Sequence, residues 1–185
     1  GAYLSFDHHV SETLRNKKHP SHIIDPDAPS AARVIYEHYG GKSRFPDLFD
    51  DLMKAVDKAD SGHFSAEEIL RPTRWPMLNF LVDKRTGIED WGRFAITEEK
   101  FKRLLIEWMG SLTIDEIMAL SDVRERCNIY WKYEQLHKEQ LAASAKIRNN
   151  IVVLDFRAQE RIYPGNRFVI YALYPHCNIS IQIKL

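Results

Sequence analysis

From Ser121 to Arg148 the chain has no glycine or proline for 28 residues. Apolar side chains recur along it at helical spacing, including Val123, Tyr130 and Leu141, with charged residues on the other side. This pattern predicts a helix of roughly 40 Å, because each helical residue advances the chain by about 1.5 Å. A helix of this length commonly connects two bodies, so we expect a domain boundary at each of its ends.

The segment before this helix is predicted to contain a strand and several short helices. Ser30, Thr97 and Thr113 stand where helix N-caps are expected, since their hydroxyl groups can accept a backbone N–H. Segments rich in proline, glycine or polar residues are predicted to be irregular. The expected order begins with a strand at 3–6, a loop at 11–29 and a helix at 31–39. A second helix, with Pro46 in its first turn, is expected to end near residue 60, and a third to begin after Ser65. An irregular stretch at 71–95 and helices after Thr97 and Thr113 follow.

The composition changes after Asn149-Asn150, where β-forming residues dominate. Strands are predicted at 151–154, 167–174 and 178–185, with a turn at 163–166, which together form a β-meander. The fold class is therefore expected to be α/β, with a mainly helical body followed by the first strands of a smaller domain. The predicted division is 1–120, a connecting helix at 121–148, and 149–185.

The charge balance and the apolar runs limit the partners of the chain. Lys and Arg number 26, as do Asp and Glu, so the net charge is zero and bulk charge does not favour nucleic-acid binding. No apolar run approaches the roughly 20 residues of a membrane-spanning helix, so no membrane partner is expected. The two cysteines, Cys127 and Cys177, lack metal-ligand spacing. Such low cysteine usage favours a reducing compartment, and we expect a cytoplasmic protein.

Two short segments carry residues suited to metal chemistry. Asp7-His8-His9 follows the first predicted strand directly, and ligands of α/β sheets bind at the carboxyl ends of strands. Asp60-Ser61-Gly62-His63 ends an amphipathic helix, and Gly62 permits a tight turn there. The alternative for each is structural: a polar turn with exposed histidines, and a helix closed by glycine.

The two segments and their order resemble the DHH phosphoesterase superfamily. Leu4 to Glu12 resembles the motif that names the superfamily, and Val56 to Phe64 is similar to its next aspartate motif. Residues 83–88 resemble members described as exopolyphosphatase-related. Residues 154–173 are similar to the opening of the associated DHHA1 domain. The resemblance covers nearly the whole chain, and it implies a parallel-sheet DHH domain, a connecting helix and the start of a DHHA1-type domain.

The resemblance implies a metal-dependent hydrolase that activates water with two cations, usually Mn²⁺ and occasionally Mg²⁺ or Co²⁺. By position, His8 and Asp60 would be metal ligands, and Asp7 a ligand or the carboxylate that orients an imidazole. His9 would bind the scissile phosphate and stabilise its developing charge. Ser61 and His63 are candidate substrate contacts. The expected substrates are short oligonucleotides, cyclic dinucleotides or their linear products, other phosphorylated nucleotides, or polyphosphate.

Three motifs of the superfamily are missing from this sequence. The upstream Asp-x-Asp and single-Asp motifs are absent, as is the downstream Gly-Gly-Gly-His motif, so the sequence is expected to be a fragment. With one histidine and one or two carboxylates as ligands, the segment alone is expected to bind metal weakly and hydrolyse little. The alternative is a non-catalytic module that binds a nucleotide or phosphate. A homodimer through the long helix stays open, and a zinc protein is disfavoured because neither cysteine lies near a histidine in ligand spacing.

The stretch at 71–95 combines cationic and aromatic residues. Such side chains can line a groove for phosphates or stacked bases. The alternative is a solvated loop whose aromatic residues cover the core. The residues concerned are Arg71, Arg74, Lys84, Arg85 and Arg93, with Trp75, Phe80 and Trp91.

Overall fold

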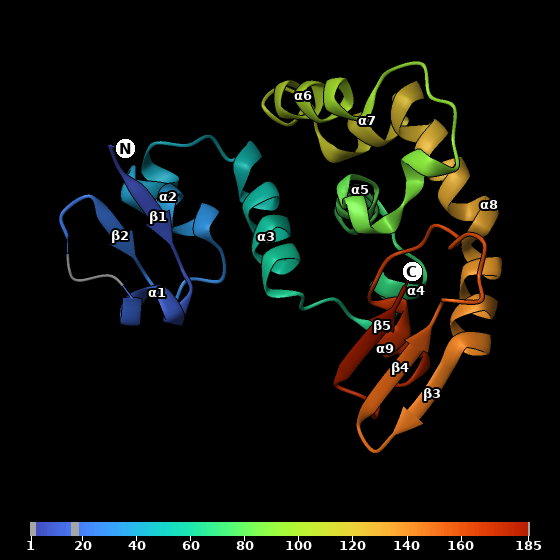
Figure 1. Cartoon of the computed structure of the whole chain (residues 1–185). Helices are drawn as coiled ribbons and strands as arrows, with labels where there is room; N and C mark the ends of the chain where they lie inside the picture. The colour runs from blue at the N-terminus through green and yellow to red at the C-terminus, as the bar shows by residue number, and fades with distance from the viewer. Residues whose placement is uncertain (1–2, 16–18, 185) are drawn as a thin grey trace. The chain divides into compact units, whose positions relative to one another are not determined.

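The structure is a computed structural model that describes residues 3–15 and 19–184. Contacts divide the chain into two compact units, Gly1–Phe64 and Ser65–Leu185. Each unit contains helices and a parallel strand pair, so the fold class is α/β as predicted (Figure 1). No described helix combines the length and apolar character needed to cross a membrane.

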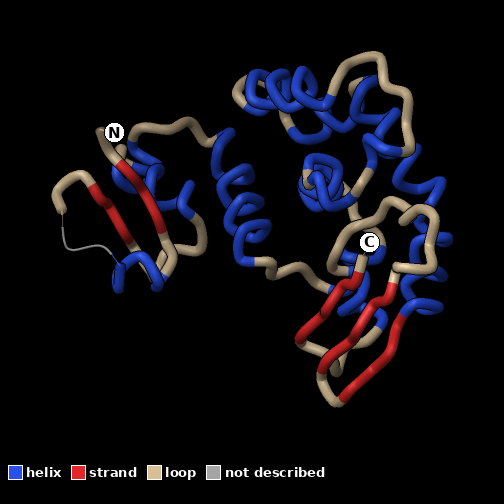
Figure 2. The backbone as a smooth tube through the Cα atoms, in the orientation of Figure 1, coloured by secondary structure: helices blue, strands red, loops and turns tan. Residues whose placement is uncertain are grey.

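The first unit is built on a parallel pair of short strands. Strand β1 (Ser5–Asp7) pairs with β2 (His22–Ile24), with Asp7 opposite Ile24 (Figure 2). Helix α1 (Val10–Arg15) lies between the two strands in sequence. The prediction of a loop at 11–29 is therefore wrong. It missed these two elements because α1 buries no residue and β2 is only partly buried. Elements with so little burial leave no clear hydrophobic period in the sequence.

Two further α-helices complete the first unit, and their ends were predicted well. Helix α2 (Ala31–His38) begins after Ser30, whose hydroxyl accepts the N–H of Arg33 at 3.0 Å. A short 3₁₀ turn, η1 (Gly41–Ser43), separates it from α3 (Leu48–Ser61). Helix α3 ends at Gly62, which has a φ of 70°, a conformation that glycine adopts without strain. Pro46 lies just before the N-cap rather than in the first turn.

The second unit contains a group of helices followed by a three-stranded sheet. Ser65 and Thr113 each form the reciprocal capping box, with Glu68 and Glu116, and Thr97 caps its own helix as predicted. The helical elements are α4 (Ala66–Leu70), α5 (Arg74–Val82), the 3₁₀ turns η2 (Lys84–Thr86) and η3 (Ile88–Asp90), α6 (Glu98–Met109), α7 (Ile114–Ala119) and α8 (Ser121–Ser144).

Helix α5 contradicts the prediction of an irregular stretch at 71–95. Four of its residues, Met77, Leu78, Phe80 and Leu81, are buried, so the helix lacks a polar face. A helix that is apolar all round shows no amphipathic period. Pro76 lies in its first turn, where proline is tolerated.

Helix α8 is four residues shorter than predicted. Residues 145–148 form strand β3 (Ala145–Arg148), which pairs antiparallel with β4 (Ile151–Asp155) across Asn149-Asn150. The φ of Asn149 is 54°, as two-residue hairpin turns require. The helix also packs within the second unit, against α5, α7 and β4, so both predicted boundaries, 120/121 and 148/149, fall inside this unit rather than between units.

The segment 167–174 is a helix rather than the predicted strand. Helix α9 (Val169–Leu173) connects β4 to β5 (Ile179–Ile183), and β5 pairs parallel with β4 (Figure 2). The sheet order is β3-β4-β5, but the parallel pairing of β5 with β4 excludes the predicted meander, whose strands would all be antiparallel. Val169 and Ile170 are adjacent and both buried. A short run of apolar residues occurs in buried helices and in buried strands, so its periodicity does not distinguish the two.

A fully buried cation, Arg126, joins α8 to the segment before α6. Its exposed fraction is 0%. Its guanidinium donates to Oε1 of Glu89 at 2.8 Å and to the backbone carbonyls of Asp122 and Ile96, both at 3.2 Å. The rings of Phe94 and Phe101 lie 4.2 and 4.0 Å from its guanidinium carbon. Every face of this side chain is thus used, and the segment from η3 to α6 is held against α8.

Replacing Arg126 by methionine should lower the free energy of unfolding by about 2–4 kcal/mol, because Glu89 and two carbonyls lose their donor. Arg126→Lys should recover only part of this loss, since an ammonium cannot reproduce the planar fork of donors. Urea unfolding measures both. The exposed Arg103 on α6 provides the control, and Arg103→Met should change stability by no more than about 0.5 kcal/mol. Equal stability of the two methionine variants would contradict the assigned role.

A second prediction concerns Tyr130, whose hydroxyl accepts the side-chain N–H of Asn166 at 2.6 Å. Burial raises the pKa of Tyr130 to about 12. The unfolded chain therefore releases this proton at lower pH, and stability should fall from about pH 10 to 12 by up to about 1.4 kcal/mol per pH unit. Unfolding measured at pH 9.5 and 11 should show a smaller decline for Tyr130→Phe. An identical decline in both proteins would refute the assignment.

Candidate functional site

Asp7 orients His9 at the end of strand β1. Oδ1 of Asp7 accepts the backbone N–H groups of His8 at 2.7 Å and His9 at 2.8 Å, and it lies 2.7 Å from Nδ1 of His9. These donors, the His9 N–H first, lower the pKa of Asp7. A carboxylate can only accept here, so Nδ1 of His9 carries a proton and Nε2 lies on the opposite side of the ring. The His9 side chain is 66% exposed.

His8 is held differently and meets Asp60. Its Nδ1 lies 3.2 Å from the backbone carbonyl oxygen of Ala28, which requires an N–H at that position. Its Nε2 faces Oδ2 of Asp60 at 3.2 Å. In a neutral imidazole with Nδ1 protonated, Nε2 bears a lone pair, and a lone pair that faces a carboxylate is repelled unless a proton or a cation lies nearby. The arrangement therefore favours a positive charge between His8 and Asp60.

Asp57 sets the position of the helix that carries Asp60. Its Oδ1 accepts the hydroxyl of Ser30 at 2.7 Å, and its Oδ2 accepts two N–H groups of Arg33, at 2.5 and 3.1 Å. The carboxylate is 15% exposed. These bonds fasten α3 to the start of α2, one turn of α3 before Asp60. Sequence analysis assigned Asp57 no role beyond its place in the motif from Val56 to Phe64.

The two other candidate contacts do not join this cluster. The hydroxyl of Ser61 donates to the backbone carbonyl of Asp57 at 2.7 Å, within α3. His63 is exposed, and its imidazole forms no hydrogen bond or ion pair with the part of the chain that the structure describes. The structure thus brings together Asp7, His8, His9 and Asp60. The roles assigned to Ser61 and His63 stay predictions.

The predicted metal ligands fit a cation only in part. Imidazole nitrogen and carboxylate oxygen are ligands that Mn²⁺ accepts, and the bond from His8 to the Ala28 carbonyl fixes the tautomer as the outer contacts of metal-bound histidines do. Asp7, however, points to His9. Within residues 3–15 and 19–184, no three His, Cys, Asp or Glu side chains form a group able to hold a metal ion. His8 and Asp60 therefore fit as two ligands of one cation.

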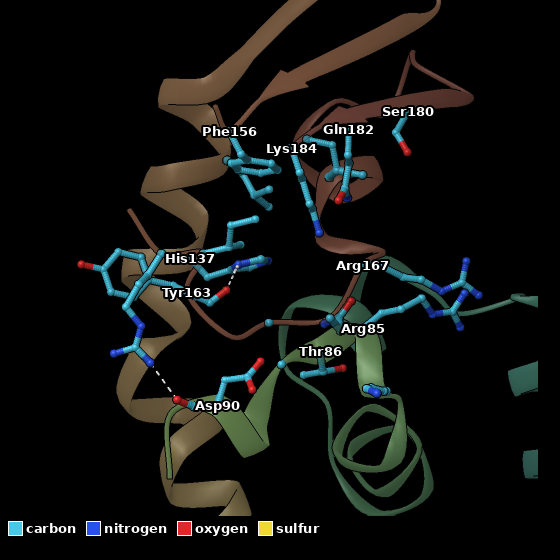
Figure 3. A pocket seen from close by; sticks show the side chains of 18 of the residues that line it. Arg85, Thr86, Asp90, His137, Phe156, Tyr163, Arg167, Ser180, Gln182 and Lys184 are labelled. Atoms are coloured by element: carbon cyan, nitrogen blue, oxygen red, sulfur yellow. Dashed lines mark hydrogen bonds between the residues drawn. The ribbon is translucent and has the colours of Figure 1, made fainter. Parts of the chain in front are cut away.

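The second unit contains a separate cavity of about 670 Å³ (Figure 3). Three residues of the cationic and aromatic stretch line it, namely Lys84, Arg85 and Trp91. The others lie elsewhere: Phe80, for example, is part of the core, and Arg74 pairs with Asp115 at 3.4 Å. Thr86, Gly87 and Asp90 of the same stretch also line it, and the remaining lining residues come from α8 and from 156–184.

No family model and no curated protein sequence matches the chain. Among solved structures, it is similar to PggH, a pGpG-specific phosphodiesterase from Vibrio cholerae, with 49% sequence identity and a TM-score of 0.82. The match covers 98% of this chain and 58% of the PggH chain. The chain thus spans less than two thirds of the length of PggH. The similarity includes both compact units, and it supports the resemblance to phosphoesterases of the DHH type.

Asp57→Asn tests how the site is held. Asp57 lies near the C-terminal end of α3, where a negative charge opposes the helix dipole, so neutralising an unpaired carboxylate there would stabilise the protein. Because Arg33 and Ser30 bind this carboxylate, we expect instead a loss of about 1–3 kcal/mol in urea unfolding. The exposed Asp27 is the matched control, and Asp27→Asn should stay within about 0.5 kcal/mol of wild type. A stabilising Asp57→Asn would refute the contact.

Proposed function

We propose that this chain carries part of the catalytic site of a metal-dependent phosphodiesterase of the DHH type, which hydrolyses a short linear dinucleotide such as pGpG. The observation that carries the proposal is the distance of 3.2 Å between Nε2 of His8 and Oδ2 of Asp60. These residues belong to the two motifs that resemble the DHH superfamily. The substrate class is taken from the similarity to PggH at 49% identity.

In this proposal, His8 and Asp60 hold a divalent cation, and Asp7 orients His9. When bound, such a cation supplies Lewis acidity toward the phosphoryl group and lowers the pKa of water. His9 is fixed through Nδ1 by Asp7 and its side chain is 66% exposed, so in the imidazolium form it can donate Nε2–H to a phosphoryl oxygen. Its imidazole would then stabilise the charge that develops on that oxygen in the transition state.

A two-metal mechanism needs more ligands than His8 and Asp60 supply. The described residues contain no third metal-capable side chain at this pair, so the second cation belongs to the proposal through the resemblance alone. The same observation favours one alternative, a non-catalytic module that binds a nucleotide or phosphate. The choice of Mn²⁺ over Mg²⁺ or Co²⁺, the cytoplasmic location, the homodimer and the low activity of the isolated segment stay predictions, as does the exopolyphosphatase-related subgroup.

An assay of pGpG hydrolysis to GMP with Mn²⁺ distinguishes the phosphodiesterase from the non-catalytic binding module. We expect turnover in the longest natural form of the protein, with His8→Ala and Asp60→Ala each reducing it by roughly 10²-fold or more, since each removes a ligand of a cation that contributes several kcal/mol to the barrier. The product is measured by chromatography, and bis-p-nitrophenyl phosphate serves as a general diester.

Matched controls are His176→Ala, which removes an exposed histidine of the second unit, and Asp51→Ala, which removes an exposed aspartate from the first turn of α3. Both should retain wild-type turnover. Circular dichroism establishes that every variant is folded. Absence of Mn²⁺-dependent turnover in a folded, full-length protein would reject the enzyme and leave the binding module.

A further inference from the structure

The cavity of the second unit has more positive than negative charge on its walls. One carboxylate, Asp90, lines it together with five cationic side chains: Lys84, Arg85, Arg161, Arg167 and Lys184. Its volume of about 670 Å³ is within the range of small-molecule sites. A concave surface with such an excess of positive charge favours an anionic ligand.

Two of these guanidinium groups share a single carboxylate. The carboxylate of Asp83 accepts hydrogen bonds from Nε and Nη2 of Arg85, both at 2.8 Å. Arg167 lies 3.7 Å from the same carboxylate, beyond hydrogen-bond distance. Desolvation and the neighbouring Arg85 lower the pKa of Arg167. One negative charge thus faces two positive ones, so Arg167 retains donors for a further anion.

Lys184 supplies a third cation to the same space. It follows strand β5, and Figure 3 shows its side chain extending into the cavity beside that of Gln182. Within the described residues its ammonium has no ion pair or hydrogen bond. An exposed lysine has no need of a partner, but this one, together with Arg167, provides donors on the cavity wall for the oxygens of a phosphate.

A buried histidine provides a hydrogen-bond acceptor on the opposite wall. His137 on α8 is 7% exposed, and its Nδ1 lies 2.9 Å from the backbone carbonyl oxygen of Tyr163, so Nδ1 carries the proton. Burial lowers the pKa of His137, against smaller opposing effects of the Tyr163 and Asn166 carbonyls. The ring is therefore neutral near pH 7, and its buried Nε2 accepts no hydrogen bond from the residues that the structure describes.

The position of His137 is built into the fold. The structure has a glycine, Gly165, beside the ring, and a Cβ there would lie 2.2 Å from Cδ2 of His137. Gly165 is itself fixed by its N–H, which donates to the backbone carbonyl of Thr86 at 3.0 Å. A buried acceptor without a donor costs roughly 1–3 kcal/mol. The cavity therefore favours a ligand that brings an O–H or N–H to Nε2.

Aromatic side chains form another part of the wall. The ring centroids of Trp91 and Tyr163 lie 5.0 Å apart, and the guanidinium carbon of Arg161 lies 3.9 Å from the Trp91 centroid. Arg161 also donates to the backbone carbonyl of Asp90 at 2.7 Å. Aromatic and guanidinium planes of this kind provide stacking surfaces for a nucleobase.

We propose that this cavity binds a nucleoside monophosphate, with the phosphate on Arg167 and Lys184, a hydroxyl or N–H of the nucleoside on Nε2 of His137, and the base against the Trp91 and Tyr163 side. Inorganic phosphate can contact Arg167 and Lys184, and as the dianion it has a single O–H, but it has no ring to stack against Trp91 and Tyr163. The site lies wholly in the second unit, and it does not rest on hydrolysis at His8 and Asp60.

Calorimetric titration of the purified protein with GMP in EDTA tests the proposal, because chelation removes any contribution from a metal site. We expect GMP to bind at least about tenfold more tightly than inorganic phosphate, which should compete with it. The double variant Arg167→Gln/Lys184→Gln should weaken GMP binding by about tenfold or more, a loss of two charge-assisted contacts.

The control, Lys100→Gln/Arg103→Gln, removes the same charge from the exposed side of α6 and should leave GMP binding unchanged. Thermal unfolding checks that both double variants remain folded. The proposal is overturned by absent GMP binding, by equal losses in the two double variants, or by equal affinities for GMP and phosphate. Because no turnover is measured, the result is independent of whether the proposed hydrolase is active.

Discussion

A charge that leaves water needs a partner, and in this chain that requirement positions both candidate sites. In the first unit the carboxylate of Asp57 is held by Ser30 and Arg33, which fastens α3 to the start of α2. Asp60 follows one turn later and faces His8 at 3.2 Å. The cost of leaving Asp57 buried and unpaired thus keeps two halves of the proposed metal site in register.

The same requirement acts in the second unit through Arg126. Its guanidinium is fully buried and binds Glu89, which belongs to the 3₁₀ turn that also carries Asp90 and precedes Trp91. Those two residues line the cavity. A buried side chain on α8 therefore determines where one wall of the cavity stands, while His137, about three turns along the same helix, contributes to another.

Local signals predicted those elements whose ends or faces are marked by chemistry. Ser30 and Thr113 were recognised because a hydroxyl at the N-cap satisfies a backbone donor wherever the helix lies. Helix α5 and helix α9 were missed for the opposite reason: each is surrounded by other elements, so its apolar residues show no helical period. Residues 145–148 were assigned to a helix because their pairing with β4 depends on residues beyond the turn.

The sequence by itself determined the α/β class, most helix caps and the residues Asp7, His8, His9 and Asp60, since each depends on residue types at short spacing. It also carried the resemblance to DHH phosphoesterases. Only the tertiary structure decided that Asp60 faces His8 while Asp7 turns to His9, and that Arg167, Lys184 and His137 share one cavity. Residues far apart in the chain meet through packing, whose geometry no local pattern records.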